Sequence, residues 1–175
     1  SMNKHVIVLG AGNAAFAAAV SARQNGAKVT MIERAPEDEA GGNTRFTAGA
    51  IRCVYDGVDD LRAIIPDLTD LEIDRTDFGS YTEADFFDDM GRVTDYRTDP
   101  DLCELLVTRS RETIRWMKDC GIKFAPIWGR QAFQVDGKFK FWGGLTVEAW
   151  GGGEGLYEGW QAVAEKAGIK IRFGT

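Results

Sequence analysis

Apolar runs and small-residue turns alternate regularly at the start of the chain. His5–Leu9 is a short β-branched run that ends at a glycine, which predicts a buried strand. Residues 13–25 are rich in alanine and are followed by Gly26, which predicts a helix with a glycine stop. Lys28–Ile32 is a second apolar run and ends at Glu33. The order strand, glycine turn, helix, strand predicts a right-handed βαβ unit.

The regular pattern is then lost. Residues 35–52 contain Gly41, Gly42 and Gly49 and show neither a period of two nor one of 3.6. Small residues suit backbone that lies close to something else, so this stretch predicts an irregular segment of that kind.

Helical patterns dominate the middle of the chain. Residues 59–65 predict a short helix stopped by Pro66, and Thr82 with Asp85 resembles a capping box that opens another helix. Asp99 and Pro100 predict the start of a long helix that runs to about residue 119. Its expected apolar face consists of Leu102, Leu105, Leu106, Thr113 and Met117.

Strand signals return towards the end. Residues 122–124 predict a strand, and residues 133–135 and 138–142 predict a hairpin across Asp136-Gly137. Three glycines, 151–153, precede a predicted helix at 154–166, either as a tight helix entry or as a second anion-binding helix start. Residues 169–173 predict a last strand.

Composition excludes several classes of protein. With 44% apolar and 27% charged residues the chain is expected to be globular, and no apolar run approaches the length that crosses a bilayer. Cys53, Cys103 and Cys120 form no CxxC pattern, which favours free thiols in a reducing, cytoplasmic compartment. His5 is the only histidine, so neither a histidine-based metal site nor a Ser-His-Asp triad is expected.

Charge is unevenly distributed along the chain. Residues 56–101 hold fifteen acidic residues against four arginines, a balance of −11 within a total of −6. The acidic stretch predicts a solvated helical surface, with an acidic partner-binding face as the alternative. Without a basic stripe, a nucleic-acid partner is not expected.

The first glycine turn carries specific chemistry. Residues 10–15 read GxGxxA between a predicted strand and a predicted helix, with Glu33 lying 21 residues beyond Gly12. Gly10 permits the tight turn, and Gly12 lets a pyrophosphate approach the backbone at the helix N-terminus. Glu33 is placed to accept hydrogen bonds from ribose hydroxyls, which disfavours a 2′-phosphate. This pattern predicts a dinucleotide site.

A second glycine segment, GGNTRFTAGA at 41–50, follows the ribose-holding acid. An NAD-binding unit would proceed into another βα unit at this point. A small-residue segment here is suited to run beside a longer cofactor and reach its far ring, and FAD is such a cofactor.

These segments resemble the fumarate reductase/succinate dehydrogenase flavoprotein family. GAGNAA, MIERAP and GGNTRFTAGA are similar to its FAD-binding segments, and TIRWMKDCGIKF and GGGEGLYEGWQAVAEKAGIKIRFGT are similar to its next landmarks. Residues 56–98 match poorly. Within the family, GGNTRF followed by IRC, Tyr55 and Asp56 is most similar to the FAD-dependent tricarballylate dehydrogenases.

The resemblance implies roles for particular residues. The first turn would contact the FAD diphosphate, Glu33 would hold the ribose, and the second segment would line the ribityl part and pass near the isoalloxazine. The implied cofactor residues are Gly10, Ala11, Gly12, Asn13, Ala14, Glu33, Arg34, Gly41, Gly42, Asn43, Thr44, Thr47, Ala48, Gly49 and Ala50. Arg45 and Arg52 are candidates to pair with a substrate carboxylate or an FAD phosphate, with structural pairing as the alternative.

The resemblance also implies limits. Members that attach FAD covalently use a histidine in the second segment, whereas Asn43 stands at that place here, so the FAD is expected to be non-covalent. Family members are much longer, and their catalytic residues come mostly from later parts of the chain. The catalytic residues are therefore unknown, and the 175 residues are expected to have no turnover alone.

Together these patterns predict an α/β, Rossmann-like FAD/NAD(P)-binding domain with a helical insertion, forming the N-terminal portion of a larger flavoprotein. The expected division is a βαβ unit and cofactor loop at 3–55, an insertion at 56–150, and a return helix and strand at 151–175. The expected activity is flavin-dependent oxidation or reduction of a small carboxylate, with an electron acceptor or donor as partner. An NAD-binding dehydrogenase and a non-catalytic nucleotide-binding module are the alternatives.

Overall fold

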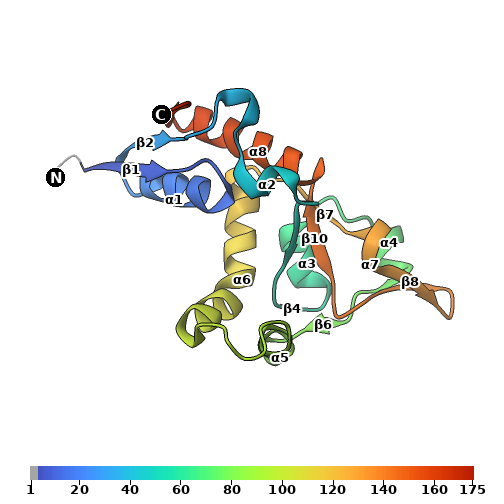
Figure 1. Cartoon of the computed structure of the whole chain (residues 1–175). Helices are drawn as coiled ribbons and strands as arrows, with labels where there is room; N and C mark the ends of the chain where they lie inside the picture. The colour runs from blue at the N-terminus through green and yellow to red at the C-terminus, as the bar shows by residue number, and fades with distance from the viewer. Residues whose placement is uncertain (1–3) are drawn as a thin grey trace. The chain divides into compact units, whose positions relative to one another are not determined.

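The computed structural model describes residues 4–175 and divides into two compact units (Figure 1). Unit 1 comprises the chain up to Gly49, the short segment Cys120–Lys123, and Ala149–Thr175. Unit 2 comprises Ala50–Asp119 and Phe124–Glu148. The predicted division at 3–55, 56–150 and 151–175 stays a prediction.

A parallel three-stranded sheet forms the centre of unit 1. Its strands are β1 (His5–Leu9), β2 (Lys28–Ile32) and β11 (Lys170–Arg172), in the order β1-β2-β11. The register pairs Leu9 with Ile32 and Ile32 with Arg172, so the three strands end at the same edge. With helices α1 (Asn13–Gln24) and α8 (Gly152–Lys166), this arrangement is half of a doubly wound fold and confirms the predicted fold class.

Aromatic and small side chains fill the core of unit 1. Phe16 of α1 stacks on Trp160 of α8 with ring centroids 6.1 Å apart, and both side chains have no exposed surface. The alanines of α1 allow this close packing of two helices. The prediction that β1 is buried was wrong, since Ile7 is 58% and Leu9 is 78% exposed, and Val6 and Val8 are only half-buried.

The segment after β2 is more regular than predicted. Glu37–Glu39 forms a 3-10 turn, η1, and Gly42–Phe46 forms a short helix, α2. Gly41 makes the entry to α2 in the left-handed region with φ 117°, which favours glycine. The sequence did not predict α2, because a helix of about one turn is too short to show an apolar period.

Unit 2 contains small sheets and several helices. One sheet has the order β3-β10-β7, a second β4-β6 and a third β5-β9-β8. The strands are β3 (Ala50–Arg52), β4 (Tyr55–Asp56), β5 (Thr76–Asp77), β6 (Ser80–Tyr81), β7 (Phe124–Pro126), β8 (Ala132–Val135), β9 (Lys138–Phe141) and β10 (Thr146–Ala149). The helices are α3 (Val58–Ile64), α4 (Asp70–Asp74), α5 (Glu83–Val93), α6 (Pro100–Cys120) and α7 (Trp128–Gln131).

Local sequence signals in unit 2 are confirmed by their hydrogen bonds. Thr82 and Asp85 form both hydrogen bonds of a capping box at α5. The Leu102 N–H donates to the Asp99 carboxylate over 2.9 Å at the start of α6. Asp136 and Gly137 take φ values of 51° and 77° between β8 and β9, as a type I′ hairpin turn requires. The strand predicted at 122–124 is shifted, since β7 begins at Phe124.

The predicted apolar face of α6 was wrong except at Met117, which is buried. Leu102, Leu105 and Leu106 are 66%, 57% and 47% exposed. The buried residues are Cys103, Val107, Ser110, Ile114 and Met117, spaced alternately by four and three positions. Ser110 is tolerated in this face because its hydroxyl donates to the Val107 carbonyl and accepts from the Val54 N–H.

Candidate functional site

The first glycine turn lies at the carboxyl edge of the sheet in unit 1. Gly10 has φ 106° and its N–H donates to the Ile32 carbonyl over 2.7 Å, which fixes the turn against β2. Gly12 is the N-cap of α1 and has no side chain to satisfy the helix N–H groups. Ala11 is buried beneath the turn. The twelve-residue helix therefore begins with bare backbone and the positive end of its dipole.

The second glycine segment lies directly beside this turn. The Asn13 N–H donates to the Thr44 hydroxyl over 3.0 Å, across 31 positions of sequence. A Cβ atom placed on Gly12 would lie 3.4 Å from the same hydroxyl oxygen and 3.8 Å from the Gly41 carbonyl. We call residues 10–13 and 41–49 the paired glycine segments.

Trp160 supports the start of α1 from α8. Its indole N–H donates to the Asn13 side-chain oxygen over 2.7 Å. Phe16 packs between this ring and Tyr157, whose centroid lies 5.9 Å away. The sequence marked Asn13 as a cofactor contact and gave no signal that its side chain meets Trp160, since 147 positions separate them.

A third run of glycines packs against the second of the paired glycine segments. The Gly153 N–H donates to the Thr47 carbonyl over 3.0 Å. A Cβ atom on Gly153 would lie 2.3 Å from the Thr44 carbonyl, and one on Gly49 would lie 2.6 Å from the Gly152 backbone. Glycines 151–153 therefore form a tight helix entry that requires bare backbone, one of the two interpretations of their sequence. The alternative interpretation, that these glycines bind an anion at the start of α8, stays a prediction.

Glu33 stands at the same sheet edge, next after Ile32. Its N–H donates to the Arg172 carbonyl over 2.8 Å, and one carboxylate oxygen accepts from the Ala35 N–H over 2.8 Å. The side chain is half-buried, and within residues 4–175 it forms no ion pair. The other carboxylate oxygen accepts no hydrogen bond within the described residues. Arg34 beside it is exposed.

Both candidate substrate arginines are engaged within their own units. The Arg45 guanidinium donates to the carbonyls of Asp38 and Ala40 over 2.7 and 3.1 Å and lies 5.7 Å from the Tyr157 ring centroid. Arg52, in unit 2, donates to the Gly143 carbonyl and lies 4.8 Å from the Tyr81 ring centroid. These contacts are structural pairings, and a role for either arginine towards substrate stays a prediction.

The remaining predicted positions fall on both units. Gly42 and Asn43 are exposed on α2, and Ala14 is exposed on α1. Thr47 donates to the Thr44 carbonyl and accepts from the Gly49 N–H, which closes the turn that also contains Ala48. Ala50 begins β3 in unit 2.

The described cysteines show no sign of a reactive or disulfide-bonded thiol. Burial raises the pKa of the Cys53 thiol to about 11, and none of the three cysteines is in a disulfide. Residues 4–175 contain no cluster of three metal-ligating side chains. None of the helices described is both long and apolar enough to cross a membrane.

The fold is that of a nucleotide-binding flavoprotein domain. The chain belongs to the family described as the FAD binding domain, whose model matches residues 5–172. It is 28% identical over 146 residues to a fumarate reductase (cytochrome) of Shewanella frigidimarina, covering 82% of this chain and 22% of that protein. The predicted membership of the fumarate reductase/succinate dehydrogenase flavoprotein family is thereby confirmed; its closeness to tricarballylate dehydrogenases is not.

Two further relatives extend the comparison. A vinyl phenol reductase of Lactiplantibacillus plantarum is 24% identical over 172 residues, covering 97% of this chain and 29% of that protein. A 3-ketosteroid delta1-dehydrogenase from Sterolibacterium denitrificans has a TM-score of 0.68 at 11% identity, with 96% of this chain and 40% of that one covered, and shows the same fold. The chain thus spans between a fifth and a third of the length of the sequence relatives.

The described residues fit FAD, the cofactor of this family. The bare backbone at Gly12 leaves room for a phosphate at the N-terminus of α1, where a side chain would meet Thr44. Glu33 lies at the sheet edge beside the same turn.

Proposed function

We propose that this chain holds FAD non-covalently along the paired glycine segments, with Glu33 accepting hydrogen bonds from the adenosine ribose. The hydrogen bond from Asn13 to Thr44 carries the proposal, because it joins the phosphate-type turn to the second segment. The other N–H groups at the start of α1, beyond that of Asn13, would face the diphosphate. Residues 43–50 would follow the ribityl chain towards the flavin ring.

We further propose that the longer protein containing this domain oxidises or reduces a small carboxylate, such as a fumarate-like or tricarballylate-like acid. Bound FAD supplies the hydride chemistry, while the protein binds and orients. The fumarate reductase relative supports a carboxylate substrate, and GGNTRF, IRC, Tyr55 and Asp56 support the tricarballylate likeness. The electron acceptor or donor would be a separate partner.

Titration of FAD into the 175-residue chain, followed by flavin fluorescence, tests the cofactor proposal. Saturable FAD binding with much weaker NAD binding is expected. NAD binding as tight as FAD would contradict it. After acid precipitation the flavin should stay in the supernatant, since Asn43 offers no histidine for attachment.

Gly12→Val provides the site-specific test. Gly12 has φ −90°, which any residue adopts, so the variant should fold while its side chain blocks the phosphate position. We expect FAD affinity to fall by at least about thirtyfold, roughly 2 kcal/mol. Gly129→Val, at a position with no atom within 4 Å of an added Cβ, is the matched control and should bind FAD normally.

Activity is tested by reduction of an artificial electron acceptor. With succinate or tricarballylate, we expect turnover from a protein that carries the complete family sequence and none from these 175 residues. Equal activity from both would contradict the proposal that the catalytic groups lie elsewhere.

A further inference from the structure

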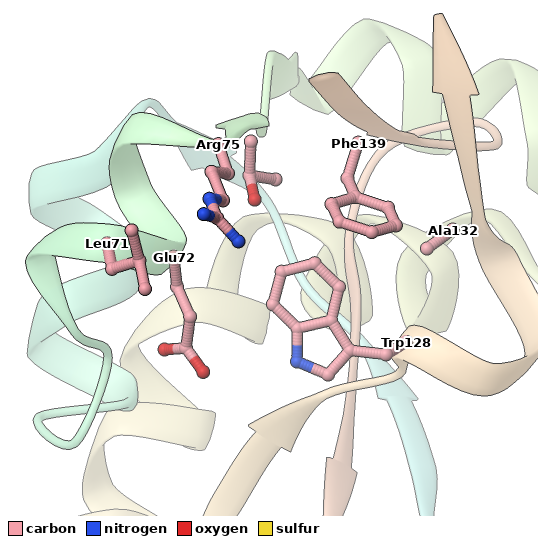
Figure 2. A pocket seen from close by; sticks show the side chains of 7 residues that line it. Leu71, Glu72, Arg75, Trp128, Ala132 and Phe139 are labelled. Carbon is pink, nitrogen blue, oxygen red and sulfur yellow. The ribbon is translucent and has the colours of Figure 1, made fainter. Parts of the chain in front are cut away.

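A pocket of about 310 Å³ lies within unit 2 and plays no part in the proposed FAD site. Figure 2 shows Leu71, Glu72 and Arg75 on one side of it and the rings of Trp128 and Phe139 on the other. Its walls therefore combine two opposite charges with two aromatic rings that pack edge to face.

The floor of this pocket comes from the sheet β5-β9-β8. Thr76 pairs in register with Phe139, which places both side chains on one face of the sheet. The Phe139 N–H donates to the Arg75 carbonyl over 2.9 Å and fixes Arg75 at the strand edge. The polar and aromatic groups are thus positioned by backbone pairing.

The Trp128 ring of the pocket wall packs against three other aromatic rings. The Trp128 ring centroid lies 5.7 Å from that of Phe139, 5.3 Å from that of Phe141 and 6.2 Å from that of Phe78. A ring fixed in this way can receive a flat apolar group without first being ordered.

The polar lining has unused binding capacity. The Thr76 hydroxyl is buried and has no hydrogen-bond partner in the described chain, which is uncommon for a buried polar group. The Arg75 guanidinium forms no ion pair with any residue from 4 to 175. Glu72 uses one carboxylate oxygen to accept from the Thr69 N–H over 2.9 Å, and its carboxylate does not reach Arg75 within ion-pair distance.

We propose that this pocket binds an α-amino acid with an aromatic side chain, as the zwitterion. The ligand carboxylate would pair with Arg75, its ammonium group with Glu72, and its ring would lie against Trp128 and Phe139. Thr76 would hydrogen-bond the ligand head group. A ligand with only one charge would place a like charge beside Glu72 or Arg75, so the zwitterion complements the lining better.

Three ligands that differ by one group test the charge requirement. L-phenylalanine, 3-phenylpropionate, which lacks the ammonium group, and phenethylamine, which lacks the carboxylate, would be titrated into the 175-residue chain by calorimetry. The proposal expects saturable binding of L-phenylalanine, with each analogue at least about tenfold weaker. The Trp128 indole N–H signal should shift in an NMR spectrum of the same titration.

Two variants assign the charges. Arg75→Gln should weaken L-phenylalanine about tenfold and should not weaken phenethylamine, whose ammonium group loses a like-charged neighbour. Glu72→Gln, which keeps the capping geometry of α4, should weaken L-phenylalanine and should not weaken 3-phenylpropionate, whose carboxylate loses a like-charged neighbour. Arg109→Gln on α6 is the matched surface control. All three should bind FAD as the unsubstituted chain does, so this proposal and the cofactor proposal fail separately.

Several results would overturn the inference. The first is the absence of saturable L-phenylalanine binding up to about 10 mM, where the binding free energy is weaker than about 3 kcal/mol. The second is equal affinity of the chain for the three ligands. The third is an Arg75→Gln variant that binds L-phenylalanine normally.

Discussion

Thr44 links the two glycine segments through one hydroxyl group. Thr44→Val keeps the shape of the side chain but leaves the Asn13 N–H without its acceptor. The half-buried position predicts a loss of about 1 kcal/mol in the free energy of unfolding, measured by urea denaturation. Thr44→Ser retains the hydroxyl and should lose less than half as much. Equal losses in both variants would mean that the methyl group, and not the hydrogen bond, matters.

Gly155 is the residue whose lack of a side chain is most strictly required. A Cβ there would lie 1.9 Å from the Trp150 carbonyl oxygen, so the helix entry would have to move. Gly155→Ala is expected to cost about 3 kcal/mol or more in thermal unfolding experiments. Gly159→Ala in the same helix meets only the flexible end of Ile122 at 3.2 Å and should stay within about 1 kcal/mol of the parent. Similar melting temperatures for the two variants would contradict this assignment.

Cys53 gives a prediction about pH. Burial raises its folded-state pKa from 9.0 to about 11, so the unfolded chain ionises first as the pH rises. The stabilising contribution of the protonated thiol is full below pH 9 and is lost between pH 9 and 11. Cys53→Ala should therefore flatten the fall in stability over that window.

At pH 8, iodoacetamide should label Cys120, which is half-buried, much faster than Cys53, as peptide mass spectrometry would show.

At the scale of elements, α6 shows where sequence patterns succeed and where they fail. Asp99 and Pro100 correctly predict its start, because capping depends on neighbouring residues alone. Its buried face was predicted from the leucines, yet the buried stripe runs through Cys103 and Ser110. Ser110 belongs there because a partner 56 positions away, the Val54 N–H, satisfies its hydroxyl. A hydropathy pattern contains no information about such a partner.

The same distinction applies to the candidate site. The turn at Gly10 and Gly12 and the acid at Glu33 could be predicted, since each follows from a strand end and a short spacing. The bond from Trp160 to Asn13 and the contact of Gly153 with Thr44 could not, because they join segments more than a hundred positions apart. The hydrogen bonds from Arg45 to the carbonyls of Asp38 and Ala40 could likewise not be predicted from the sequence.

A pair of substitutions tests the face of α6. Ser110→Ala would leave the Val54 N–H unpaired and is expected to cost about 1 to 2 kcal/mol. Leu105→Ala removes a larger apolar group, but from a side chain that is 57% exposed, and should cost no more than about 0.5 kcal/mol. Urea denaturation gives both values. A larger loss of unfolding free energy for Leu105→Ala than for Ser110→Ala would mean that the leucines form the buried face of α6 after all.

At the scale of the whole molecule, the two compact units allow ligand effects to be located. All proposed FAD contacts except Ala50 lie in unit 1, and the proposed amino-acid pocket lies in unit 2. A ligand that binds only the folded state stabilises it by about 2.7 kcal/mol at a hundredfold excess over its Kd. Regions of one chain can open separately, so this protection need not be shared by both units.

Hydrogen exchange measured by mass spectrometry turns this into a prediction. FAD should slow exchange in peptides covering β1, α1, β2 and the start of α8, and leave the β8–β9 hairpin unchanged. L-phenylalanine should protect peptides that cover residues 70–77 and 128–141 and leave β1 and α1 unchanged. Gly12→Val should abolish the first effect alone, and Arg75→Gln the second alone. If either ligand protected both units equally, the two sites would be coupled, and the independence that separates the two proposals would be lost.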